Sequence, residues 1–144
     1  MSRPKRQYKK KSYYHIYNRG NNREKVFKTS SDKSFFISLL YRYRNKTDLV
    51  LDTYTVMDNH FHLILRTGNK PEIISKFMQR VCTSYAMITN RKYSRVGHIF
   101  QGRYNAKYLR YKKDLKQVRS YIKQNPVKEG LVKKAKDYPW SRFE

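Results

Sequence analysis

Two apolar segments on either side of Asp58-Asn59 constrain the fold more than any other feature of this sequence. Residues 50–57 (VLDTYTVM) and 60–67 (HFHLILRT) are rich in the β-branched and aromatic side chains that favour strands. The two residues between them both tolerate positive φ angles and therefore suit a tight turn. The sequence predicts an antiparallel β-hairpin over residues 50–67.

The second strand of this hairpin begins with two histidines. Alternate residues of a strand point to the same face, so His60 and His62 project together while Phe61 points the other way. Two imidazoles at this spacing can share one divalent metal ion. Alone, such a pair is more often structural or exposed, and it has too few ligands for a structural zinc site.

The remaining elements are predicted from periodicity and from turn residues. Ser30 and Ser31 are candidate N-caps, Asp32 favours a first helical turn, and Pro71 suits the first turn of a second helix. Pro126 disfavours helical geometry at Asn125 and so predicts the end of the last helix. The expected elements are strands over 12–19 and 103–110, helices over about 32–45, 71–91 and 114–125, and a loop over 94–102.

This order of elements predicts an α+β fold. It matches a ferredoxin-like βαββαβ antiparallel sheet with an added C-terminal helix that carries Tyr121. The 144 residues suit a single domain over 12–144.

Residues 1–11 form a basic arm, interpreted either as a flexible solvated tail or as an arm that settles on phosphate when DNA is present; the two are compatible.

Charge indicates the kind of partner. The chain has 34 Lys and Arg against 10 Asp and Glu, a formal net charge of +24. In a folded protein with this charge the basic side chains repel one another, and binding to a polyanion relieves that repulsion. Nucleic acid is the usual polyanion. Charge alone fits a protein that merely coats nucleic acid about as well as it fits an enzyme.

Cysteine content and hydropathy indicate the compartment. The lone Cys82 cannot form an internal disulfide, and its helical surroundings predict a small core residue. No apolar run approaches the ~18 residues of a membrane span, and no signal-peptide core follows the basic start. We therefore expect a cytoplasmic protein without a membrane partner.

The last predicted helix supplies further candidate residues. Tyr121 and Asn125 are four residues apart and share one face, so Asn125 could reach a metal held by the histidines while Tyr121 reaches a phosphate. Asp114 lies near the same azimuth and is a weaker candidate ligand. One tyrosine among 14 usually serves packing, but a phenolate can attack phosphorus to form a covalent phosphotyrosine.

Several motifs together resemble the HUH-type single-tyrosine transposases, and especially the REP-associated tyrosine transposases. They occur in the family's order over nearly the whole chain, from about residue 12 to residue 143. The matching segments are YHIYNRG at 14–20, MDNHFHL at 57–63, FQGRY at 100–104, YIKQNPV at 121–127 and YPWS at 138–141.

The resemblance implies a metal-dependent endonuclease and strand transferase that acts on single-stranded DNA near hairpins, such as palindromic repeats. It implies Tyr121 as the nucleophile that joins the 5′-phosphate. It also implies His60 and His62 as ligands of Mg²⁺ or Mn²⁺, with Asn125 as the third ligand. Both a monomer and a homodimer are compatible with it.

DNA-binding residues can be ranked by position. Arg19 and Arg103 fall within the matched motifs and are the first candidates. Further candidates lie off the apolar stripe of the second helix or in the loop after it, where an ordinary solvated face is an equally good interpretation: Arg80, Arg91, Lys92 and Arg95. Two alternatives to the enzyme stay open, a catalytically inactive nucleic-acid-binding derivative and an RNA-processing protein.

Overall fold

A computed structural model describes residues 6–143 and confirms the predicted α+β architecture. Its sheet has five antiparallel strands in the order β4-β1-β3-β2-β5, so the first four have the predicted ferredoxin-like order. The strands are β1 (Tyr13–Arg19), β2 (Val50–Val56), β3 (His60–Arg66), β4 (Asn105–Leu109) and β5 (Ser141–Arg142). The α-helices are α1 (Ser30–Arg44), α2 (Ile73–Lys92) and α3 (Lys112–Lys128), and short 3-10 turns occupy Asn21–Arg23 and Ala135–Asp137.

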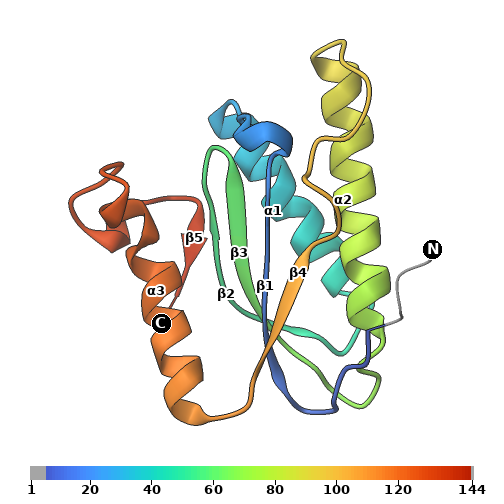
Figure 1. Cartoon of the computed structure of the whole chain (residues 1–144), viewed down its shortest axis with the longest axis vertical. Coiled ribbons are helices and arrows are strands. Elements are labelled where there is room, and N and C mark those ends of the chain that lie inside the picture. Colours follow the sequence, from blue (N-terminus) through green and yellow to red (C-terminus); the bar gives the residue numbers. More distant parts are fainter. Residues whose placement is uncertain (1–5, 144) are drawn as a thin grey trace.

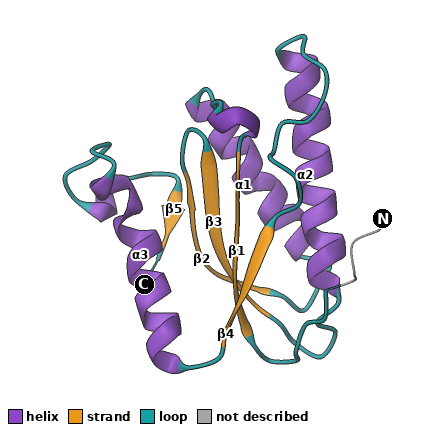
Figure 2. Cartoon of the chain, viewed as in Figure 1, coloured by secondary structure: helices purple, strands orange, loops and turns teal. Residues whose placement is uncertain are grey.

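The helices cover both faces of the sheet. Helices α1 and α2 lie on one side and α3 lies on the other (Figures 1 and 2). The larger core fills the α1/α2 side and includes Ile16, Phe36, Phe61, Leu63, Phe77 and Tyr85. A smaller core under α3 consists of Ile64, Leu109, Leu115 and Ile122. Side chains alternate between the two faces of β3, so Phe61 and Leu63 point into the larger core while Ile64 points into the smaller one.

The β2–β3 hairpin is confirmed, but the expected reason for its turn was wrong. Neither Asp58 nor Asn59 has a positive φ. Tertiary contacts hold the turn instead, because the backbone N–H groups of Val26 and Phe27 both donate to the Asp58 carbonyl at 2.9 Å. The Asp58 carboxylate also lies 2.7 Å from Lys33 Nζ.

The helix boundaries differ from the predicted ones. Thr29, rather than Ser30 or Ser31, caps α1, because its hydroxyl accepts from Asp32 N–H while the Asp32 side chain accepts from Thr29 N–H. Helix α2 begins at Ile73, with Pro71 in the turn before it.

The predicted end of α3 at Asn125 was also wrong. The helix continues through Pro126 to Lys128. Proline lacks only its own N–H, so it removes a single hydrogen bond near this end of the helix. Both Asn125 and Pro126 are buried there, and the Glu129 N–H donates to the Asn125 carbonyl. Packing therefore outweighs the local preference of proline.

The two ends of the described chain both pack on the body. Tyr8 is buried, its ring meets Tyr14 edge-on, and its hydroxyl lies 2.7 Å from that of Tyr104. The described part of the arm, from residue 6, is thus not a free tail, while residues 1–5 lie outside the described residues. Near the other end Trp140 packs against the larger core, and Tyr138 donates to the Val56 carbonyl at 2.6 Å.

No helix in the described part of the chain has the length and apolar character needed to cross a membrane.

Helix α3 is held to the sheet by an ion pair as well as by the smaller core. A bulge between Leu51 and Thr53 interrupts the β2–β3 register at Asp52. The Asp52 carboxylate accepts from Arg119 Nε at 2.9 Å and from Arg119 Nη2 at 2.6 Å. Such a two-pronged contact fixes direction as well as distance. It therefore sets the position of α3 only two residues before Tyr121.

Acid is expected to weaken the fold through Asp32. Burial alone would raise the pKa of this carboxyl group, but hydrogen bonds from Lys92 and Tyr93 hold the pKa below its ordinary value. The ionised Asp32 carboxylate therefore adds to the free energy of unfolding at pH values above its unfolded pKa near 3.8. This stabilisation is lost as the pH falls through the lower folded pKa. We expect Asp32→Asn to lower the free energy of unfolding by about 1–3 kcal/mol at pH 7.

Urea titrations at pH 7 and at pH 2 check this expectation. The difference between wild type and Asp32→Asn should be smaller at pH 2 than at pH 7, because pH 2 lies below the unfolded pKa near 3.8. The exposed Glu24 provides the control, since Glu24→Gln should stay within about 0.5 kcal/mol of wild type at both pH values. A difference for Asp32→Asn that grows on acidification would contradict the assignment.

Candidate active site

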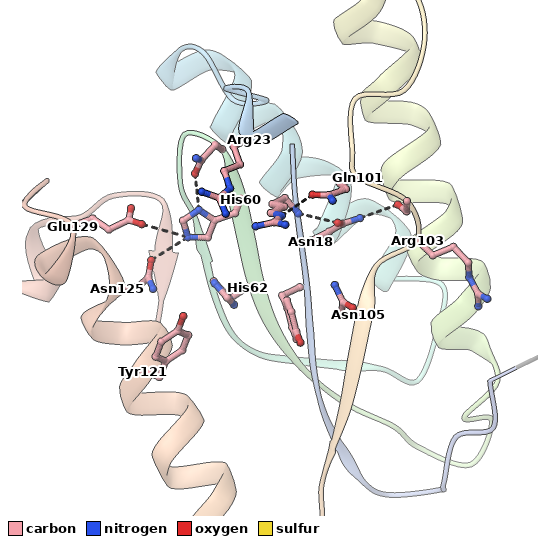
Figure 3. Close-up of a pocket in the computed structure, with 14 residues that line it drawn as sticks. Asn18, Arg23, His60, His62, Gln101, Arg103, Asn105, Tyr121, Asn125 and Glu129 are labelled. Carbon is pink, nitrogen blue, oxygen red and sulfur yellow. Dashed lines mark hydrogen bonds and ion pairs between the residues drawn. The ribbon is translucent and has the colours of Figure 1, made fainter. Parts of the chain in front are cut away.

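A cavity of about 710 Å³ opens between α3 and the end of the sheet where β1 ends and β3 and β4 begin (Figure 3). The cavity is lined by Tyr121 and Asn125 of α3 and by Glu129, the C-cap residue of that helix, at successive intervals of four residues that bring all three to the same side. The rest of the lining consists of Tyr17, Asn18, Arg19, Arg23, Asn59, His60, His62, Gln101, Gly102, Arg103 and Asn105.

His60 lies between two groups of side-chain oxygen atoms. Its Nδ1 is 2.7 Å from Oδ1 of Asn59. Its Nε2 is 3.1 Å from Oδ1 of Asn125 and 3.9 Å from Oε1 of Glu129. An amide oxygen only accepts, so a hydrogen on Nδ1 of His60 would donate to Asn59. Nε2 of His60 faces two further side-chain oxygen atoms, an arrangement that suits a cation between them.

His62 is more deeply buried than His60, with 8% of its surface exposed. The two rings meet edge-on with centroids 5.2 Å apart, which confirms that they project from the same face of β3. On its other side, Nδ1 of His62 lies 3.0 Å from Nε2 of His15, a residue of β1. Burial lowers the pKa of His62 to about 3, and that of His15 to about 4. Both rings are therefore neutral near pH 7.

Tyr121 reaches the cavity from α3 and remains accessible. Its ring stands perpendicular to that of His62, with centroids 5.4 Å apart. The side chain is 47% exposed, which leaves the phenol open to a large substrate. Figure 3 shows Tyr121 and His62 facing the same space below Asn125. A nucleophile so placed can act on a group bound beside the two histidines.

Three arginines are among the residues that line the cavity. Arg19, Arg23 and Arg103 all border the cavity, and Arg19 Nε donates to Gln101 Oε1 at 2.7 Å. Among the lining residues only Glu129 carries a formal negative charge at neutral pH. This balance favours an anion, and guanidinium groups are suited to phosphate.

The donor atoms are suited to a divalent cation. The described residues contain no cluster of three His, Cys, Asp or Glu, so no closed structural metal site is present among them. The available set is instead His60 and His62 with the amide oxygen of Asn125 and the carboxylate of Glu129. Mixed nitrogen and oxygen ligands on an open wall suit an ion that keeps positions free for a substrate. The residues present fit the expected metal.

Asp114 was the alternative third ligand, and it does not line this cavity. It shares the azimuth of Tyr121, but seven residues at 1.5 Å each place it about 10 Å away along the helix. Glu129 was not predicted, because the helix was expected to end at Asn125. His15 and Arg23 were not predicted either.

The predicted DNA-binding residues separate into two groups. Arg19 and Arg103 border the cavity. The other four, Arg80, Arg91, Lys92 and Arg95, belong to α2 and the segment after it and do not line the cavity. Lys92 contacts Asp32 at 2.7 Å, which gives it a structural partner.

Comparisons with known proteins agree with this architecture. The model of a family described as IS200-like transposases matches residues 8–125. Over 100 residues the chain is 30% identical to a Haemophilus influenzae protein that is named as a REP-associated tyrosine transposase. That match covers 61% of this chain and 55% of the relative, so the chain spans about half the length of its curated relative.

Two solved structures share the fold. One is a REP-associated tyrosine transposase bound to a REP hairpin, with a TM-score of 0.79 and 21% identity over 98% of this chain and 82% of that one. The other is a transposase structure from Deinococcus radiodurans, with a TM-score of 0.58 and 18% identity over 86% of this chain and 97% of that one. At these identities the likeness concerns the fold.

Proposed function

The chain belongs to the family of IS200-like transposases, and from this we propose that it cuts and rejoins single-stranded DNA beside hairpins through Tyr121. The observation that carries the proposal is the placement of an accessible Tyr121 on α3 against His62, one turn before the Asn125 that contacts His60. The REP hairpin bound to the structural relative supports hairpin DNA as the partner.

The proposed chemistry is transfer of a phosphodiester to tyrosine. The Tyr121 oxygen attacks the scissile phosphorus, the bond from phosphorus to the 3′ oxygen breaks, and that oxygen leaves with the proton that the phenol gives up. The product is a 5′-phosphotyrosine and a free 3′-hydroxyl end. A 3′-hydroxyl that attacks the phosphotyrosine in the reverse sense rejoins a strand and restores the phenol.

His60, His62, Asn125 and Glu129 would hold the Mg²⁺ or Mn²⁺ that this chemistry requires. When bound, such an ion acts as a Lewis acid that polarises the scissile phosphate and stabilises its developing charge. The protein's own part is to keep three of these ligands on rigid elements, two on β3 and one within α3.

Arginines would position the DNA strand. Arg19, Arg23 and Arg103 border the cavity and are proposed to contact its phosphates, where Gln101 orients the Arg19 guanidinium. The net charge of +24 would draw DNA toward this cavity. The four basic residues on and after α2 remain candidates for contacts farther along the DNA: Arg80, Arg91, Lys92 and Arg95.

The proposal is tested by trapping the protein–DNA adduct. Wild-type protein with Mn²⁺ and hairpin-bearing single-stranded DNA should give a slower band on a denaturing gel. EDTA should reduce its formation on the order of 10²-fold or more, since Lewis-acid stabilisation supplies several kcal/mol, and excess Mn²⁺ should restore it.

Matched substrates separate the competing functions. An RNA hairpin of the same sequence should form no adduct, and equal cleavage of RNA would favour an RNA-processing protein. Tight binding of the DNA hairpin with no adduct at any metal concentration would favour the inactive binding protein. An adduct that is indifferent to EDTA would contradict the metal-dependent mechanism.

A further inference from the structure

His15 is a buried histidine to which the proposed chemistry gives no role. It lies on β1, 8% exposed, opposite Ile64 of β3. Its Nε2 is 3.0 Å from Nδ1 of His62, and the two rings are stacked with centroids 5.2 Å apart. It does not line the cavity, so any influence on the site passes through His62.

The contact between the two rings has only two possible directions. Two buried neutral imidazoles at 3.0 Å share one hydrogen, which belongs either to Nδ1 of His62 or to Nε2 of His15. In the first case Nε2 of His62 keeps a lone pair. In the second case Nε2 of His62 carries the hydrogen and cannot bind a cation.

His60 provides a second example of the same arrangement. Its Nδ1 faces Oδ1 of Asn59, which can only accept, while its Nε2 faces Oδ1 of Asn125. Both histidines of β3 thus have Nδ1 engaged by a neighbour outside the candidate ligand set. For His62 that leaves Nε2 as the one nitrogen available to a ligand.

The direction of the contact between His15 and His62 decides whether His62 can bind a cation. If Nε2 of His62 is the nitrogen that binds, His15 must accept from the Nδ1–H of His62, because the opposite hydrogen position blocks Nε2. Tyr17 stacks on the His62 ring, with centroids 5.7 Å apart, and further restricts its rotation. Neighbours on β1 therefore define both the orientation and the hydrogen-bonding partner of His62.

We propose that His15 is a positioning residue: its Nε2 accepts the Nδ1–H of His62 and so keeps the lone pair of His62 Nε2 available to a divalent cation. This inference rests on the proposed function, because the choice between the two hydrogen positions follows from a cation at Nε2 of His62. Groups that orient a metal-binding histidine in this way commonly change metal affinity by about 10–100-fold when they are removed.

The first test needs neither metal nor DNA. Long-range ¹H–¹⁵N correlation spectra of the metal-free wild-type protein should show His62 as the Nδ1–H tautomer, with Nε2 unprotonated. The opposite tautomer, with the hydrogen on His62 Nε2, would overturn the inference. Because no activity is measured, this result stands whether or not the chain cuts DNA.

The second test compares two variants at the same position. His15→Leu removes the acceptor, and its dissociation constant for Mn²⁺, measured by calorimetry without DNA, should rise about 10–100-fold. His15→Gln restores a side-chain carbonyl oxygen and should recover most of that loss. Equal affinities for wild type and His15→Leu, or a Gln variant as weak as the Leu variant, would overturn the inference.

Two controls keep these outcomes distinct. Thermal unfolding of both variants without metal shows whether lost affinity follows lost structure, because a purely structural role predicts that affinity tracks stability rather than the presence of an acceptor. If wild type binds no Mn²⁺, the metal-dependent mechanism fails, while the spectra still decide the role of His15. The spectra of the wild-type protein also decide the role of His15 if the His15→Leu variant does not fold.

Discussion

Tyr121→Phe is expected to abolish the covalent adduct while the variant still folds and still binds hairpin DNA. The substitution removes only the phenolic oxygen, and 47% of this side chain is exposed, so little packing is lost. Without the oxygen no phosphotyrosine can form. Loss of a covalent nucleophile lowers turnover by on the order of 10³-fold or more. Denaturing gels measure the adduct, and fluorescence anisotropy measures hairpin affinity, which should stay within about twofold of wild type.

Tyr17 supplies the matched control. It is the other tyrosine that lines the cavity, and it stacks on His62 from β1 rather than from α3. Tyr17→Phe should therefore keep the adduct. An adduct that persists in Tyr121→Phe and disappears in Tyr17→Phe would transfer the nucleophile to β1 and refute the proposed role of α3.

Phe61→Ala is expected to have the largest effect on stability. Phe61 lies between the two histidines of β3, has no exposed surface, and packs against Phe36 and Phe100 with centroids 5.0 and 5.6 Å apart. Removing a buried aromatic ring costs about 3–5 kcal/mol, a large fraction of the roughly 5–15 kcal/mol that typically stabilises a domain. The melting temperature should fall by about 10–20 °C, as measured by calorimetry or circular dichroism.

Phe61→Leu separates packing from any direct role in binding. It keeps a large apolar side chain and should cost about 1–2 kcal/mol. Because the neighbouring histidines depend on the position of this strand, Mn²⁺ affinity should follow stability across the wild type and the Phe61→Leu and Phe61→Ala variants. A Phe61→Ala variant that loses less than about 1 kcal/mol would show that the larger core does not extend beneath the histidines.

The central part of the site could be predicted because it depends on local periodicity. His60 and His62 are two residues apart on a strand, and Tyr121 and Asn125 are four residues apart on a helix. Each pair therefore had to share a face wherever its element was placed. What sequence alone did not supply was the packing of α3 on the histidine face, which depends on the smaller core and on the pair between Arg119 and Asp52.

The missed residues depend on long-range structure. Glu129 was overlooked because Pro126 carried a local signal for the end of a helix, and that signal was outweighed by burial. His15 falls within the matched segment at 14–20, but its contact with His62 depends on the register between β1 and β3. Arg23 follows Asn22, and both have positive φ values, a backbone path that no periodicity predicts.

The order of the elements along the chain separates the two halves of the proposed chemistry in time. The proposed metal ligands His60 and His62 lie on β3, whereas the proposed nucleophile Tyr121 lies on α3, about 60 residues later. A chain still being synthesised therefore presents His60 and His62 before Tyr121 has been added. It cannot form a covalent link to DNA at that stage, however well it binds a hairpin. The proposed cleavage therefore requires α3 to be complete and docked on the sheet, so it is a property of the finished fold.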